Sequence, residues 1–330
     1  MSKSLISKIY KTICMLSVAG FISVGNLSAK KITIGWTSYP ADIPVIADAI
    51  RGGRDEGKRL GVELVFALGA GAAAQANKMD DLIARGVDVI AINPEDSQAI
   101  GASVKKANAA GIPVVMWIGD NLGGGKTVSL VSSDEELGGY SIAKWGFNRL
   151  GGIGRVAFIQ GAIAHQAGLN RENGFRRAMV KYPKIELVGY GEANWARDKA
   201  NSIAADMITR DPNIEMIFAM SDAMAKGVLS AVKSSNTSQK ITGYNGDCET
   251  LNSVWNDGIL ATLYQGWRDI GAQTIRTSLD VAKGKSVPKK IIMPTFVIDK
   301  PAMAAIVAGT YDGVTPGLEY DVKQAISGCK

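Results

Sequence analysis

The sequence predicts an α/β protein built from two lobes, each of them a doubly wound parallel sheet. Runs that are almost continuous in Val and Ile alternate with amphipathic helical segments, a pattern typical of parallel strands covered on both faces and joined by right-handed crossovers. The alternation restarts after residue 134, which indicates a second unit of the same kind. Gly61, Gly86 and Gly111 each separate a helical segment from the next strand, where a left-handed cap is expected.

The first unit contains strands and helices in strict alternation. In its second helical segment, Met79, Leu82 and Ile83 fall on one face at helical spacing. We expect strands over residues 31–36, 62–66, 87–92 and 113–117, and helices over residues 44–60, 73–85 and 97–110.

The second unit follows a short strand over residues 130–134 and repeats the same order. We expect strands over residues 155–159, 185–188, 216–219, 240–243 and 260–263, and helices over residues 136–150, 170–181, 199–210 and 222–234. Ligands of such sheets bind outside the carboxyl ends of the strands. Two lobes that face each other with these edges would therefore form a cleft.

Composition and charge exclude several classes of protein. A chain of 330 residues with 46% hydrophobic and 21% charged residues is ordinary for a globular protein of about two domains. The net charge of +6 falls to +3 without the first 29 residues, because Lys3, Lys8 and Lys11 lie there and no acid precedes Asp42. No basic stripe of the kind that nucleic-acid binders carry is visible, so no nucleic-acid partner is expected.

The first 29 residues have the pattern of a secretory signal peptide. Three lysines precede an apolar stretch over residues 13–25, and Ala29 offers a small residue for cleavage. The stretch is too short for the roughly 20 residues of a membrane-spanning helix. We therefore expect an exported protein that is soluble after cleavage and begins near Lys30, with an uncleaved N-terminal anchor as the alternative.

The cysteines agree with export. Removal of the leader removes Cys14 and leaves Cys248 and Cys329, an even number for an oxidising compartment. We expect one disulfide between them, and two unpaired buried thiols are the alternative. The chain has a single histidine, His165, so no metal site is expected.

Enzymatic and regulatory functions find little support in the sequence. His165 lies in a polar loop, where we expect it to be exposed or to rim a ligand rather than to act in catalysis. Residues 123–127 superficially resemble a phosphate-binding loop, but Asp120 stands where the first glycine of that motif is required. A sugar-responsive repressor would need a DNA-reading headpiece, and the leader stands in its place. We expect no enzyme and no cofactor.

An ordered series of short motifs resembles the ribose-binding-like periplasmic proteins, with their type I periplasmic binding fold. The series extends from about residue 31 to residue 297 and comprises residues 92–97, 107–114, 133–139, 171–175, 221–225, 243–246 and 256–265. The resemblance implies a periplasmic substrate-binding protein of a bacterial ABC importer that captures a neutral sugar or sugar-like polyol by hinge closure. A membrane permease would be its partner, and the protein would be a monomer. The alternative is a sensory binding protein that presents a sugar-like or autoinducer-type ligand to a membrane receptor or sensor kinase.

The resemblance also implies discontinuous lobes, because three segments cross between lobes in that family. We expect the crossings near Ser132, Tyr264 and Pro294. The N-terminal lobe would then comprise residues 30–132 plus about 265–293, and the C-terminal lobe residues 133–264 plus about 294–330.

Candidate ligand-binding residues of the second lobe follow from the resemblance. Arg171 falls at the family's arginine position, where its planar fork could donate to two ligand oxygens and would be hydrated in an open cleft. Trp195 falls at an aromatic position and would cover the C–H surface of a sugar. Asn245 and Gln265 would hold hydroxyls from the hinge side, and Ser221 replaces a family asparagine.

The first lobe departs further from the family. Val45 and Ile46 stand where relatives often carry paired aromatics. Polar candidates follow the first and fourth strands, and two tryptophans end those strands at the expected cleft edge. These first-lobe candidates are Thr37, Asp42, Asp120, Asn121, Trp36 and Trp117.

Overall fold

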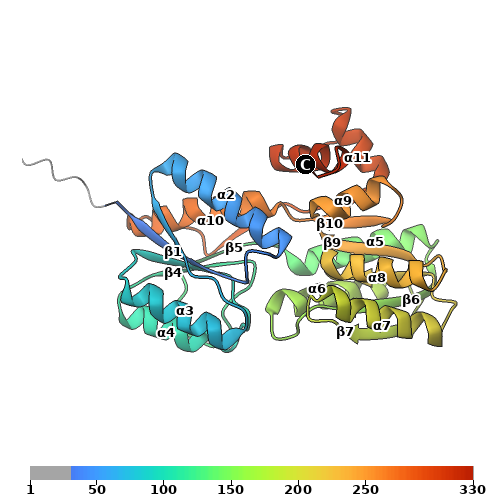
Figure 1. Ribbon diagram of the computed structural model, residues 1–330, viewed down its shortest axis with the longest axis horizontal. Helices are drawn as coiled ribbons and strands as arrows, with labels where there is room; N and C mark the ends of the chain where they lie inside the picture. The colour runs from blue at the N-terminus through green and yellow to red at the C-terminus, as the bar shows by residue number, and fades with distance from the viewer. Residues whose placement is uncertain (1–30, 330) are drawn as a thin grey trace, which may run out of the picture. The chain divides into compact units, whose positions relative to one another are not determined.

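The computed structural model describes residues 31–329 and confirms the expected fold class. These residues form two six-stranded sheets, each covered by helices (Figure 1). The predicted signal peptide, residues 1–29, lies outside the described residues, as does Cys14. Between residues 31 and 329, no helix combines the length and apolar character required to span a bilayer.

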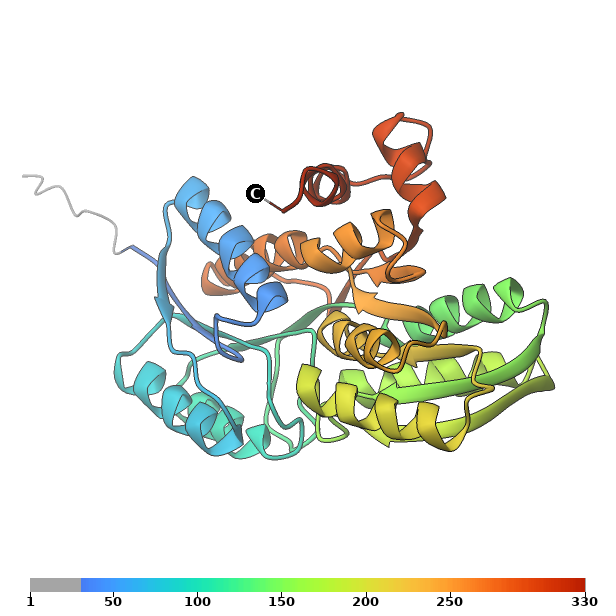
Figure 2. The same cartoon turned by 45° about the vertical axis from the view of Figure 1, so that its right-hand side comes forward.

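The first sheet is parallel throughout. Its strand order is β11-β5-β4-β3-β1-β2. Helices α2 and α10 pack against each other on one face, and α3 and α4 lie on the other (Figures 1 and 2). The strands are β1 (Thr33–Thr37), β2 (Glu63–Phe66), β3 (Val89–Ile92), β4 (Val114–Trp117), β5 (Ser129–Ser133) and β11 (Lys290–Met293), and the helices are α2 (Pro44–Leu60), α3 (Ala72–Ala84), α4 (Ile100–Ala109) and α10 (Trp267–Ala282).

The second sheet has the order β12-β10-β9-β8-β6-β7. Five strands are parallel, whereas the edge strand β12 runs antiparallel to β10. Helix α5 packs on α6, and α7 packs on α8. The strands are β6 (Ile153–Gln160), β7 (Lys184–Glu192), β8 (Met216–Ala219), β9 (Lys240–Asn245), β10 (Ala261–Tyr264) and β12 (Phe296–Asp299), and the helices are α5 (Glu135–Arg149), α6 (Gln166–Met179), α7 (Arg197–Arg210), α8 (Asp222–Ser234), α9 (Cys248–Trp255), α11 (Lys300–Val307) and α12 (Pro316–Ile326).

The chain passes between the two sheets at three places. It leaves the first sheet after β5 and enters α5, which covers the second sheet. It returns between β10 and α10, through Gln265 and Gly266. It leaves again between β11 and β12, through Pro294 and Thr295.

Helix α6 begins four residues earlier than the periodicity indicates, at Gln166 instead of residue 170. The cause is an N-cap that apolar spacing does not reveal: the Nδ1 atom of His165 accepts a hydrogen bond from the backbone N–H of Ala167 at 3.1 Å. The longer helix places Arg171 in its second turn.

A close approach of two helices fixes the position of Arg171. A Cβ atom added at Gly139 of α5 would overlap the carbonyl oxygen of Arg171 on α6. Because glycine has no side chain, the two backbones can come this close. The contact sets the spacing between α5, which carries Glu135, and α6, which carries Arg171.

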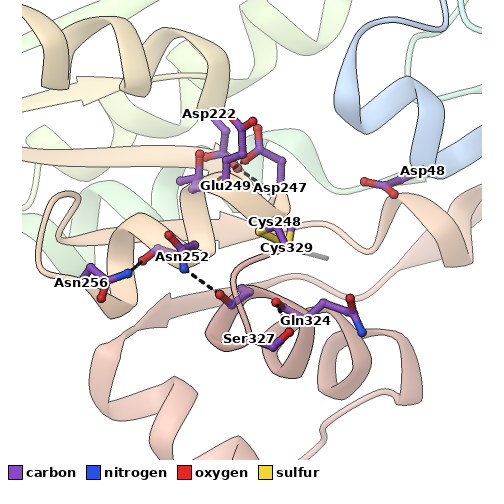
Figure 3. Close-up of a disulfide and its surroundings, with 12 residues drawn as sticks. Asp48, Asp222, Asp247, Cys248, Glu249, Asn252, Asn256, Gln324, Ser327 and Cys329 are labelled. Atoms are coloured by element: carbon purple, nitrogen blue, oxygen red, sulfur yellow. Dashed lines mark hydrogen bonds between the residues drawn. A yellow bond between two sulfur atoms is a disulfide. The ribbon is translucent and has the colours of Figure 1, made fainter.

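The C-terminal segment packs on the second lobe near its edge strand. Helix α12 lies on α9, where Asn252 donates to the carbonyl oxygen of Ala325 at 2.8 Å. Cys248, which begins α9, and Cys329, which follows α12, lie side by side with their Cα atoms 5.8 Å apart (Figure 3). This separation is within the range observed for disulfides.

Candidate ligand site

A cavity of about 260 Å³ lies at the carboxyl ends of strands from both sheets. This volume is somewhat smaller than the roughly 300–1,000 Å³ of pockets for drug-sized ligands, so the cavity suits a small molecule. The position agrees with the rule that open α/β sheets bind ligands outside their carboxyl edges. The lining residues are Tyr39, Asp42, Ile43, Pro44, Val45, Ile46, Asn93, Ile118 and Trp267 from the first lobe, and His165, Ala167, Arg171, Trp195, Ser221, Ala223, Asn245 and Asp247 from the second.

Among the described residues that line this cavity, Arg171 carries the positive charge, and three hydrogen bonds hold its guanidinium in place. Its Nε atom donates to Glu135 Oε2 at 2.8 Å, and its two Nη atoms donate to the carbonyl oxygen of Met220 at 2.7 Å and to Gln265 Oε1 at 3.2 Å. A guanidinium has five N–H groups, so two remain for a ligand. The side chain is 3% exposed. In this conformation the ion pair replaces water around Arg171. The expectation of a hydrated side chain concerns the open cleft and stays a prediction.

Gln265 lies beneath the cavity and does not line it. Its Nε2 atom donates to Glu135 Oε1 at 2.6 Å and to the Ser133 hydroxyl, while its Oε1 atom accepts from Arg171 and from Asn245 Nδ2, the latter at 2.8 Å. These contacts occupy both ends of the amide. Gln265 therefore positions Arg171 and Asn245 instead of offering its own groups to a ligand.

Trp195 covers one side of the cavity from an unusual backbone conformation. Its φ angle is +65°, a left-handed value that a tryptophan rarely adopts. A Cβ atom at Gly161 would overlap the Trp195 ring, so the indole rests directly on backbone. The ring centroid of Trp195 lies 6.2 Å from that of His165, and the His165 centroid lies 6.1 Å from that of Tyr39 in the first lobe. Positive φ at Ile118 and Asn245, which also line the cavity, adds to the strain that often accompanies binding sites.

His165 joins the two lobes beside the cavity. Its Nδ1 atom accepts from Ala167, so its Nε2 atom carries the proton and donates to Asn93 Oδ1 of the first lobe at 3.0 Å. The backbone N–H of Ser97 donates to the carbonyl oxygen of Ala164 at 3.0 Å in the same region. The side chain is buried, so of the two expected positions the structure excludes the exposed one. Burial, followed by the nearby charge of Arg171, lowers the pKa of His165 to about 3.

The structure brings together five of the candidate residues and separates the others from the cavity. Asp42, Arg171, Trp195, Ser221 and Asn245 line it, and Gln265 supports it.

Among the remaining candidates, Trp36 and Trp117 are fully buried in the core of the first lobe, where their ring centroids lie 4.6 Å apart. Thr37 is buried without lining the cavity. Asp120 and Asn121 serve a local turn, in which Asn121 Nδ2 donates to the carbonyl oxygen of Gly124 at 2.8 Å.

Several lining residues were missed by the sequence analysis. Tyr39, Asn93, Ile118 and Asp247 each follow a strand within two residues, so a rule that selects every residue just beyond a strand would have found them. Trp267 lies at the start of α10, after a crossing between lobes, and no local pattern points to it.

A two-lobed α/β fold with a cavity lined by both lobes defines a small-molecule binding protein. A family model described as "Periplasmic binding protein domain" matches residues 34–286. The ribose import binding protein RbsB of Bacillus subtilis (strain 168) is 31% identical over 285 residues, which cover 86% of this chain and 92% of that protein.

A further relative and a solved structure are similar to this chain in the same way. The D-allose-binding periplasmic protein of Escherichia coli (strain K12) is 32% identical over 258 residues, covering 74% of this chain and 83% of that protein. The crystal structure of an ABC transporter periplasmic solute binding protein from Actinobacillus succinogenes 130z, with bound D-allose, superimposes with a TM-score of 0.78 at 26% identity and covers 82% of this chain and 98% of that one.

The chain therefore belongs to the family of periplasmic binding proteins. The resemblance to ribose-binding-like members that the motifs indicated is confirmed. As a member of this family, the protein is a binding protein and not an enzyme.

We predict that His165 makes stability sensitive to acid. Its pKa is lower in the folded protein than the value of about 6.5 in an unfolded chain, so below pH 6.5 the unfolded state binds the additional proton. The contribution is complete above pH 6.5 and declines by up to about 1.4 kcal/mol per pH unit towards pH 3. Between pH 7 and pH 5, the wild type should lose about 2 kcal/mol more unfolding free energy than His165→Gln.

Urea unfolding of both proteins at pH 7, 6 and 5 measures this difference. The other titrating groups are common to both proteins and cancel in the comparison, since the chain has one histidine. A difference between wild type and variant that stays constant across this range would show that His165 is not held neutral by the fold.

Proposed function

We propose that this cavity captures one neutral sugar or sugar-like polyol for an ABC importer. The observation that supports this proposal most directly is that both lobes line the cavity with polar and aromatic groups. Arg171 retains two N–H groups, Asn245 Oδ1 receives no hydrogen bond from the described residues, and the Ser221 hydroxyl is free to donate while its oxygen caps α8. Directional groups of this kind match the hydroxyls of a sugar.

The aromatic side chains complement these polar groups. Tyr39 and Trp267 of the first lobe and Trp195 of the second line the same cavity. Aromatic faces pack against the C–H surface of a sugar ring, which hydroxyl partners leave uncovered. Val45 and Ile46 add an aliphatic wall where many relatives would carry aromatics, so the ligand need not be ribose itself.

Capture by closure follows from the way the ligand would contact both lobes. The rigid bodies of this motion would be the expected lobes, residues 30–132 plus about 265–293 and residues 133–264 plus about 294–330. A ligand that contacts both lobes stabilises the closed state over the open one. The contacts of His165 with Asn93 and with the ring of Tyr39 would form in the closed state together with the ligand contacts.

The cellular setting of the proposal comes from the leader and the relatives. Residues 1–29 would direct export and be cleaved, which would place a monomeric protein in the periplasm, where a membrane permease receives the closed form. The relatives named above are an import binding protein and two periplasmic binding proteins. Neither these relatives nor residues 31–329 favour the sensory alternative.

A ligand panel tests the proposed substrate class. Ligand at 100 times its dissociation constant should stabilise the folded protein by about 2.7 kcal/mol, which raises the melting temperature in a thermal-shift assay. We expect a rise with at least one member of a panel of pentoses, hexoses and alditols. If no member has an effect while an amino acid or peptide does, the proposed class is wrong.

We also propose that Cys248 and Cys329 form a disulfide in the exported protein. Their Cα separation of 5.8 Å permits the bond without movement of the backbone. It would close a loop with a sequence separation of 81 residues, for which chain entropy gives about 4.5 kcal/mol of stabilisation.

The proposed bond can be tested on protein purified from the periplasm. Alkylation without reduction, followed by mass spectrometry, should leave both cysteines unmodified and recover one cross-linked peptide pair. Reduction before alkylation is the control and should label both. Complete labelling of both thiols without reduction would exclude the bond.

A further inference from the structure

The cation of the cavity has a carboxylate directly beneath it. Arg171 and Glu135 are both 3% exposed at the side chain and pair at 2.8 Å between Nε and Oε2. Glu135 does not line the cavity itself, so a ligand would contact Arg171 and not its partner. The pair therefore presents a guanidinium whose charge is already compensated.

Four donors hold the Glu135 side chain. Its Oε1 atom accepts from Ser133 Oγ at 3.0 Å and from Gln265 Nε2 at 2.6 Å, and its Oε2 atom accepts from Arg171 and from the hydroxyl of Tyr244 at 3.1 Å. Because a carboxylate only accepts hydrogen bonds, this set of donors fits it on both oxygens. Burial and the neighbouring Glu135 charge raise the pKa of Tyr244 far above its usual value, so its hydroxyl remains a donor.

The other charges around the cavity add no free cation. Asp247 pairs with Lys226 at 3.1 Å, and Asp42 adds a carboxylate at the exposed rim. His165 is neutral at ordinary pH. Among the cavity-lining residues of the described chain, no positive charge lacks a carboxylate partner.

We propose that Glu135 determines the charge selectivity of the cavity: it makes the site accept neutral sugars and polyols and reject the corresponding sugar acids. The inference rests on the proposed function and refines its substrate class. A ligand carboxylate would have to share the guanidinium with Glu135, which would bring two like charges together in a site of low dielectric. Glu135 acts through Arg171 and is therefore a positioning residue.

The corollary is that loss of the Glu135 charge inverts the preference. Glu135→Gln keeps the size of the side chain and one accepting oxygen, and it leaves Arg171 as a buried cation without a partner. Such a cation is strongly unfavourable until an anion pairs with it. An anionic ligand then supplies the missing carboxylate.

The matched control is the next residue of the same helix. Glu136 also pairs with an arginine, Arg177, at 2.6 Å, but both side chains are more than 40% exposed and lie outside the cavity. Glu136→Gln therefore makes the same chemical change in an arginine–glutamate pair that no ligand touches. Glu135→Asp is the conservative variant, since it keeps the charge.

The experiment compares two kinds of probe on the wild type and the three variants. The anionic probes are sodium acetate and sodium D-ribonate, and the neutral probes are D-ribose, D-allose and xylitol. Thermal shift and titration calorimetry are measured at one ionic strength, with sodium chloride as the reference salt.

In Glu135→Gln, acetate and ribonate should raise the melting temperature above the sodium chloride reference. Wild type, Glu136→Gln and Glu135→Asp should show no such rise. Where a sugar acid and a neutral sugar both bind, the ratio of the affinity for the acid to the affinity for the neutral sugar should be at least tenfold higher in Glu135→Gln than in the wild type. This ratio corresponds to about 1.4 kcal/mol.

A purely structural role for Glu135 would not produce this change in charge preference. The proposal is overturned if anions stabilise Glu135→Gln no more than Glu136→Gln. Should Glu135→Gln fail to fold in sodium chloride, refolding should be restored by acetate or ribonate, and failure of that rescue overturns the proposal equally. The anion measurements need no sugar to bind. If the wild type responds to no member of the sugar and alditol panel but does respond to an amino acid or peptide, the proposed function is contradicted and the test of Glu135 remains intact.

Discussion

The buried ion pair between Arg171 and Glu135 is the interaction on which the rest of the site depends. Removing two charges from water is costly, and a single pair seldom recovers that cost unless further hydrogen bonds satisfy both groups. Tyr244, Gln265 and Ser133 supply those bonds to Glu135, while Met220 supplies one to Arg171. Loss of either charged partner would leave the other as an unpaired buried charge, which typically lowers the stability of a protein by about 3–5 kcal/mol. The burial of Ser133, Tyr244 and Gln265 around Glu135 is thus explained by one constraint.

The same network lies where the chain crosses between the lobes. Ser133 ends β5 at the first crossing, and Gln265 follows β10 at the second. Both bond to Glu135, so the guanidinium that faces the cavity is anchored to the segments about which the lobes would rotate. His165, which also lines the cavity, contacts the first lobe through Asn93 and the ring of Tyr39. Ligand contact and lobe closure would therefore stabilise each other.

The sequence predicts the fold well because its signals are local. Strand and helix periodicity repeats within each unit, and short motifs over residues 171–175 and 243–246 identify Arg171 and Asn245. The sequence does not indicate the direction of a side chain. Trp36 and Trp117 lie at or next to the carboxyl ends of β1 and β4, but both are buried in the core. The sequence also cannot reveal the role of Glu135. Gln265, which donates to it, lies 130 positions away, and no sequence pattern indicates that the two residues meet.

Solution scattering tests capture by closure most directly. Small-angle X-ray scattering would compare the protein alone with the protein saturated by a ligand from the sugar and alditol panel. If the ligand draws the two lobes together, the radius of gyration decreases on saturation and the largest interatomic distance shortens. A ligand that saturates the protein in calorimetry while the scattering profile stays the same would contradict closure around the cavity.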